Sequence, residues 1–100
     1  MVVEINKDNW SSEVLEYTGT VIVDFYGNWC MPCKMLAPIV DKVAEENDIK
    51  LAKVDIDDNE ELVNEFRIMS VPTLKVFKNG KEVASSVGLI GEEKILDLIK

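Results

Sequence analysis

Two cysteines, Cys30 and Cys33, are the residues of this 100-residue chain whose type and spacing could carry chemistry. They stand three positions apart in the run from Trp29 to Lys34, which reads WCMPCK. Residues three apart on a helix have Cα atoms about 5 Å apart, a distance that a disulfide tolerates. The pair could therefore alternate between dithiol and disulfide with little movement of the backbone.

The position of the pair along the chain favours a reactive thiolate. The β-branched run Val21-Ile22-Val23 precedes it and is typical of a buried strand, and a helical pattern begins at Cys33. The cysteines should thus lie in the first turn of a helix. Unpaired N–H groups and the helix dipole lower the pKa of a thiol there, which makes Cys30 the better nucleophile. Pro32 suits a first turn because its missing N–H would have had no partner.

Three other interpretations of the cysteine pair remain open. A structural disulfide across so small a loop would contribute only about 2 kcal/mol. Half of a zinc site would need a second chain, as in a metal-bridged dimer, because this chain has no histidine and no third cysteine. The two could also be inert core residues. We favour a redox role, because a CxxC motif after a strand in a βαβ pattern is a specific signal, and we expect no metal and no cofactor.

Composition excludes several other classes of protein. The absence of histidine rules out hydrolysis driven by an imidazole base. A net charge of −8 repels phosphate backbones and anionic lipid headgroups. The sequence shows no membrane-spanning apolar stretch and no export signal at its start. We expect a monomer in the cytoplasm that binds neither nucleic acid nor membranes.

Strand and helix patterns alternate along the chain. Asn79-Gly80 predicts a hairpin turn, Pro38 predicts a helix kink, and residues 49–56 alternate with Lys50 and Lys53 at polar positions. The expected fold is α/β, a mixed central sheet of about five strands with about four helices covering both faces, in a single domain over residues 1–100. The predicted strands are 2–5, 20–26, 49–56, 73–77 and 82–87, and the predicted helices are 9–17, 33–47, 59–66 and 92–100.

With these motifs in place, the chain resembles the thioredoxin family from end to end. The resemblance implies the thioredoxin fold and a protein-disulfide reductase that acts on disulfide-containing proteins and is recharged by a thioredoxin reductase. Met31 departs from the family, which has glycine there, and Met31-Pro32 is the dipeptide that tunes the redox potential. The matching segments are residues 23–34, Ala37-Pro38, Lys53-Val54-Asp55, residues 70–74 and Val87-Gly88.

The resemblance also implies roles for the reacting groups. Cys30 would be the nucleophile and Cys33 the resolving thiol. Asp24 stands in an apolar strand, where burial would raise its pKa and let it exchange a proton with Cys33. From the residues alone, a carboxylate at a solvated strand end is equally open for Asp24. Lys53 would modulate the titration of Asp24, although a lysine on an alternating strand usually just faces solvent.

A substrate surface is implied around the cysteines. The resemblance makes the Val71-Pro72 peptide bond cis, whereas the sequence alone favours trans. Trp29, Val71, Pro72 and Gly88 would then frame a flat apolar contact surface, with ordinary packing as the alternative. Residues 41–66 hold ten acidic and three basic side chains, which we interpret as solvated helix faces and loops away from the cysteines.

Two other functions compete with a disulfide reductase. A binding module could keep the fold and use the surface around Trp29 and Pro72 without turnover, but the intact CxxC motif argues against it. A disulfide oxidase or isomerase is disfavoured because no export signal is found.

Overall fold

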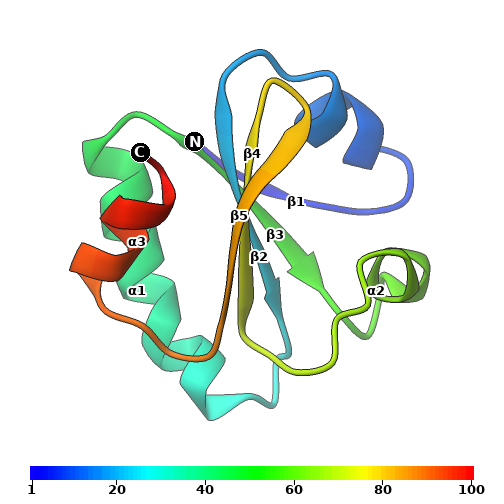
Figure 1. Ribbon diagram of the computed structural model, residues 1–100. Coiled ribbons are helices and arrows are strands. Elements are labelled where there is room, and N and C mark those ends of the chain that lie inside the picture. Colours follow the sequence, from blue (N-terminus) through cyan, green and yellow to red (C-terminus); the bar gives the residue numbers. More distant parts are fainter.

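The computed structural model describes residues 1–100 and alternates strands with helices as predicted (Figure 1). Helix α1 begins at Met31, two residues before the predicted start. The predicted helix over residues 9–17 is shorter, and its Glu16 N–H donates to the Ser11 carbonyl at 2.8 Å, a wide π-type turn. The elements in chain order are β1 (Val2–Glu4), η1 (Ser11–Leu15), β2 (Thr20–Tyr26), α1 (Met31–Glu46), β3 (Lys50–Asp55), α2 (Glu60–Glu65), β4 (Thr73–Lys78), β5 (Lys81–Val87) and α3 (Glu92–Leu98).

The five strands form one mixed sheet in the order β1-β3-β2-β4-β5, which confirms the predicted architecture. Strands β1 and β2 run parallel to β3, while β4 runs antiparallel to both β2 and β5. The β-branched strand β2 is therefore the middle of the sheet, and its residues 21–25 are all buried. The segment that carries the cysteines begins directly after β2.

Helices cover both faces of the sheet, α1 and α3 on one and η1 and α2 on the other (Figure 1). Because successive side chains of a strand point to opposite faces, β2 contributes Ile22 to the core under α1 and α3, and Val21, Val23 and Phe25 to the other core. The same alternation puts Asp24 on the α1 face, below the cysteine helix. No helix is long and apolar enough to cross a membrane.

The hairpin between β4 and β5 has the predicted Asn-Gly turn. Both Asn79 (φ 52°) and Gly80 (φ 83°) have positive φ, as a two-residue type I′ turn requires. A Cβ on Gly80 would also lie 2.3 Å from the Leu15 carbonyl oxygen, so glycine is needed for close approach as well. The turn is tied to the sheet by Asn79 Oδ1, which accepts the Gly19 N–H at 2.9 Å.

Strand β3 is buried on both faces and lacks the predicted alternation of apolar and polar positions. Lys50 and Lys53 are three residues apart, so their side chains point to opposite faces of the sheet. Lys50 is 5% exposed and faces η1, where its Nζ donates to Glu13 Oε1 at 2.6 Å and lies 3.9 Å from the centre of the Tyr17 ring. A buried ammonium is retained because these partners replace water.

Candidate functional site

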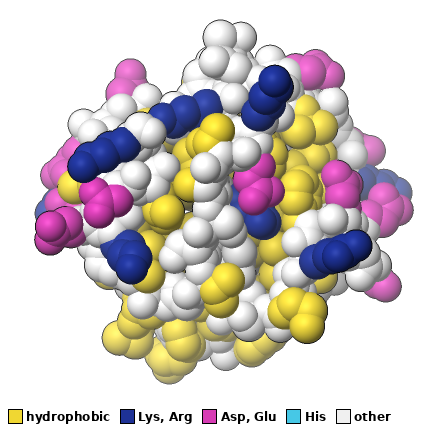
Figure 2. Space-filling view, viewed as in Figure 1, with side chains coloured by type: hydrophobic (Ala, Val, Ile, Leu, Met, Phe, Trp, Pro, Cys, Tyr) yellow, Lys and Arg dark blue, Asp and Glu magenta, His cyan; other side chains and the backbone are white.

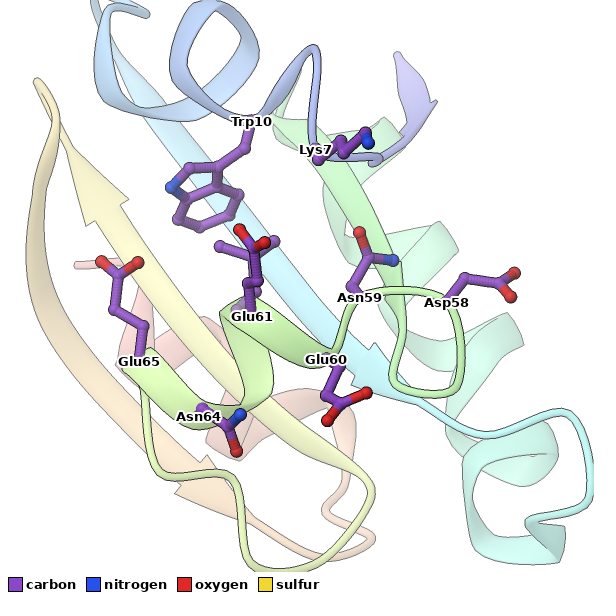
Figure 3. A pocket seen from close by; sticks show the side chains of 9 residues that line it. Lys7, Trp10, Asp58, Asn59, Glu60, Glu61, Asn64 and Glu65 are labelled. Atoms are coloured by element: carbon purple, nitrogen blue, oxygen red, sulfur yellow. The ribbon is translucent and has the colours of Figure 1, made fainter.

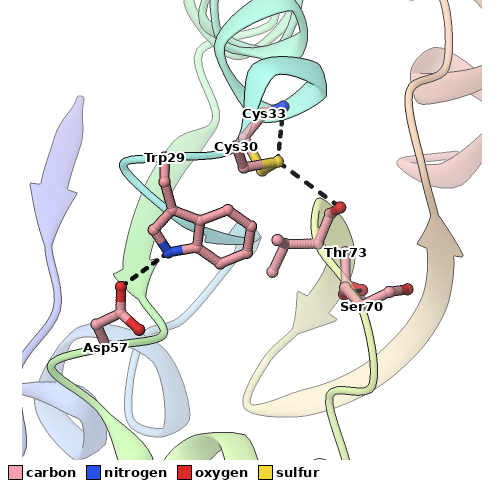
Figure 4. Close-up of a disulfide and its surroundings, with 7 residues drawn as sticks. Trp29, Cys30, Cys33, Asp57, Ser70 and Thr73 are labelled. Atoms are coloured by element: carbon pink, nitrogen blue, oxygen red, sulfur yellow. Dashed lines mark hydrogen bonds between the residues drawn. A yellow bond between two sulfur atoms is a disulfide. The ribbon is translucent and has the colours of Figure 1, made fainter.

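The two cysteines form a disulfide at the start of α1, where the sequence placed them. Cys30 is the N-cap residue and Cys33 lies in the first turn, with their Cα atoms 5.3 Å apart. The Cys33 N–H donates to Cys30 Sγ at 3.2 Å (Figure 4). In the reduced protein this N–H and the dipole of a 16-residue helix would stabilise negative charge on the Cys30 sulfur. Pro32 occupies the first turn as predicted.

A second segment, distant in sequence, lies against the disulfide. The Val71-Pro72 peptide bond is cis, as the resemblance implied, and the Val71 carbonyl oxygen is 3.7 Å from Cys30 Sγ. The Pro72 carbonyl accepts the Gly88 N–H at 2.8 Å. The loop with Gly88 is therefore joined to the Val71-Pro72 segment, which in turn lies against the disulfide.

The surface around the disulfide is apolar and exposed. Trp29 is 66% exposed and Met31 64% exposed, while both cysteines are only 5% exposed and Pro72 is buried. Figure 2 shows hydrophobic side chains gathered at the lower pole of the molecule, where Figure 1 places the start of α1 and the neighbouring loops. Further exposed apolar side chains are Met35 in α1, Val87 at the end of β5, and Met69 and Leu89 in the loops. Apolar exposure of this kind marks an interaction site.

Asp24 is buried beneath the cysteine helix, as predicted. It is 1% exposed, and its Oδ1 has no hydrogen-bond partner. Burial raises the pKa of Asp24 from 3.8 to about 6, with smaller upward contributions from Asp41 and Glu4 and an opposing one from Lys53. A carboxyl group with this pKa takes up and releases a proton near neutral pH.

Lys53 lies beside Asp24, as the sequence suggested. The two residues are direct neighbours across β2 and β3, and both line a cavity of about 150 Å³. The Lys53 ammonium lies 5.3 Å from the centre of the Tyr26 ring, and the Tyr26 hydroxyl donates to Glu4 Oε2 at 2.7 Å. Burial and this hydrogen bond raise the pKa of Tyr26, so the hydroxyl stays protonated.

Asp24 and Cys33 line the same cavity. It is large enough to admit water. The structure thus brings a sulfur and a titratable carboxyl group to one small space. The complete lining is Asp24, Tyr26, Gly27, Asn28, Cys33, Lys34, Ala37 and Lys53.

Two acidic residues of the middle run lie at the site, so the interpretation of that run as remote was incomplete. Asp57 Oδ2 accepts the Trp29 indole N–H at 3.0 Å (Figure 4), and Asp55 Oδ2 accepts from the Asn28 side chain at 2.9 Å. Sequence reasoning missed both acceptors. An indole N–H that is held in place usually has a partner, but a partner 28 residues away leaves no local pattern.

A separate hollow of about 530 Å³ lies between α2 and the segment before η1 (Figure 3). Trp10 and several acidic side chains line it, and it contains no cysteine. Nowhere in the chain do three or more acidic or cysteine side chains converge so as to hold a metal ion. The cysteine chemistry therefore does not involve this hollow. Its lining is Lys7, Trp10, Asp58, Asn59, Glu60, Glu61, Leu62, Asn64 and Glu65.

Comparison with known proteins agrees with this geometry. The sequence profile of the family described as Thioredoxin matches residues 1–100. A thioredoxin from Rickettsia typhi is 40% identical, with 99% of this chain and 96% of that protein covered. A bifunctional thioredoxin reductase/thioredoxin from Mycobacterium leprae is 37% identical over 96% of this chain, which spans 21% of that protein. The structure of a mutant thioredoxin from Halobacterium salinarum superposes with a TM-score of 0.89 at 37% identity, covering 98% of this chain and 87% of that one. The chain belongs to the thioredoxin family.

Proposed function

We propose that this protein reduces disulfide bonds in other proteins, with the Cys30–Cys33 pair as its two-electron donor. The observation that carries the proposal is a CxxC pair at disulfide distance on a helix N-terminus, next to an exposed apolar surface. A buried structural disulfide would need no such surface. Membership of a family whose relatives are named thioredoxins supports the same function.

The first step is attack on the target disulfide. The Cys30 thiolate, stabilised by the Cys33 N–H, attacks one target sulfur, and the target's S–S bond breaks. A mixed disulfide forms, and the other target sulfur leaves as a thiolate that takes a proton from solvent. Trp29, Val71 and Gly88 surround Cys30 and provide the apolar and backbone contacts for an extended target segment.

The second step releases the target. Cys33 loses its proton and attacks Cys30 Sγ, which breaks the mixed disulfide and frees the second target thiol. Two electrons have then passed from the cysteine pair to the target. Asp24 accepts the Cys33 proton through the shared cavity, and Lys53 tunes the affinity of Asp24 for it. Met31 and Pro32, between the two cysteines, lie where they can tune the redox potential of the pair, and the contribution of Met31 is small because methionine adds no charge.

The dithiol form must be regenerated after each turnover. We infer that a thioredoxin reductase supplies the electrons, because a relative combines the two names in one chain. A compartment that keeps thiols reduced, such as the cytoplasm, fits this cycle.

The test is reduction of a generic protein disulfide by the dithiol form, with trapping of the intermediate. Cys33→Ser should accumulate a mixed disulfide with the target, whereas Cys30→Ser should form none, and only the wild type should turn over when coupled to a thioredoxin reductase. The proposal fails if the wild type leaves the target oxidised, or if Cys30→Ser and Cys33→Ser trap equally. Normal function of a Cys30→Ser/Cys33→Ser variant would indicate a binding module instead.

A further inference from the structure

The Trp29 indole lies directly on the backbone of Gly27. A Cβ atom built on Gly27 would lie 2.8 Å from Trp29 Cε2 and 2.9 Å from Cζ2, closer than real Cβ atoms come to other heavy atoms. Gly27 is buried, follows β2 directly, and accepts the Cys30 N–H on its carbonyl at 3.1 Å. The indole thus occupies the space that a side chain at residue 27 would fill.

The same indole is fixed at its polar edge. Its N–H donates to Asp57 at 3.0 Å (Figure 4). The Asp57 backbone N–H donates to Asp55 Oδ1 at 2.9 Å. Asp55 also holds the neighbouring Asn28 side chain. Although it is held at two places, Trp29 remains 66% exposed, so a large aromatic face is presented in a defined orientation next to Cys30. A preorganised aromatic surface binds with less loss of side-chain entropy than a mobile one.

We propose that Gly27 is a positioning residue for target binding, because its bare Cα fixes the Trp29 indole where it receives an apolar or aromatic side chain next to the target's disulfide. This inference rests on the proposed function and names a preferred target class. Gly27 does not touch the target. It acts through Trp29, whose exposed face makes the contact.

The substitution that tests this is Gly27→Ala. Gly27 is not among the residues with positive φ, so alanine fits its backbone. The atoms that an added methyl would meet belong to the exposed indole ring and not to the backbone, so the indole moves and the fold remains. Gly91→Ala is the matched control, because a Cβ there meets no atom within 4 Å and Gly91 lies outside the site.

Single-turnover rates of the reduced protein should be measured with two disulfide-bonded peptides and with bis(2-hydroxyethyl) disulfide. The peptides are identical except for tryptophan or glycine beside the cysteine. Gly27→Ala should lower the rate constant for the tryptophan peptide about 2- to 10-fold, the range of an aromatic pair. The rate constant for the small disulfide should fall less than that for the tryptophan peptide, and Gly91→Ala should match the wild type with all three. In a Trp29→Ala background, Gly27→Ala should have no additional effect.

A spectroscopic readout separates displacement of the indole from loss of structure. In ¹H–¹⁵N NMR spectra, Gly27→Ala should shift the indole N–H signal of Trp29 and leave that of the buried Trp10 in place. The inference is refuted if the Trp29 signal does not move, if all three disulfides slow equally, or if the two substitutions are additive. The inference is refuted, and the proposed function is not, if the wild type reduces both peptides and Gly27→Ala does so at the same rates. A wild type that reduces neither peptide refutes the proposed function and this inference together.

Discussion

Replacing Asp24 by asparagine should stabilise the folded protein, by an amount that depends on pH. Burial raises the pKa of Asp24 from 3.8 to about 6, which means that the folded state disfavours the ionised carboxylate. The corresponding penalty above pH 6 is about 3 kcal/mol, a large part of the stability of a domain of this size.

The sign follows from proton linkage. Below pH 3.8 the carboxyl group is protonated in both the folded and the unfolded chain, so it contributes no penalty. As the pH rises from 3.8 to about 6, only the unfolded chain ionises freely, and the wild type loses stability relative to the neutral variant. Asp24→Asn should therefore match the wild type in acid and exceed it at pH 8.

Urea unfolding of the oxidised protein at pH 3.5, 5, 6 and 8 measures this difference. At pH 8 the urea midpoint of Asp24→Asn should be about 1–3 M higher than that of the wild type. Asp8→Asn changes the same charge at an exposed position and should show no such pH-dependent gain. A gain that is equal at pH 3.5 and pH 8, or a less stable Asp24→Asn at pH 8, would refute the reasoning.

Three further substitutions test other parts of the structure. Lys53→Met removes the charge that lowers the pKa of Asp24. The midpoint of the pH profile for mixed-disulfide resolution, measured by stopped flow, should therefore move to higher pH. No shift is expected if Lys53 only faces solvent. Glu13→Gln should lower the free energy of unfolding in urea by about 1–3 kcal/mol, because it leaves the Lys50 ammonium buried without its counter-charge. Lys50→Met should lower it by less, and the reverse order would contradict this account. Met31→Gly should change the redox potential by less than about 30 mV in equilibrium with glutathione, since methionine adds no charge, and a larger shift would show that Met31 tunes the couple.

Local patterns predicted the elements and the position of the cysteine pair well. The β-branched run in β2, the Asn79-Gly80 turn and the CxxC motif each depend on neighbouring residues alone, and each lies where it was predicted. The burial of Asp24 also followed from its apolar neighbours together with the family resemblance.

Features that depend on long-range contacts were not predictable in this way. Lys50 was assigned a polar position in an alternating strand, because the pattern does not show that η1 covers that face of β3. The Trp29–Asp57 hydrogen bond joins residues 28 positions apart. The contact of the indole with the Gly27 backbone depends on how the Trp29 side chain folds back. In each case the side chain contacts a group that lies against it only in the folded protein.

Because β2 is the middle strand, two different lengths of chain lie beside it near the cysteine pair. On one side of β2 lies β3, which brings Lys53 to Asp24, and on the other lies β4, which is preceded by Val71 and Pro72. The first 66 residues thus carry both cysteines, Asp24 and Lys53, whereas the exposed apolar surface near the disulfide is shared between Trp29, Met31 and Met35 and the later residues Met69, Val87 and Leu89. A substitution in either length of chain can therefore alter that surface, but only the first length carries the cysteine pair.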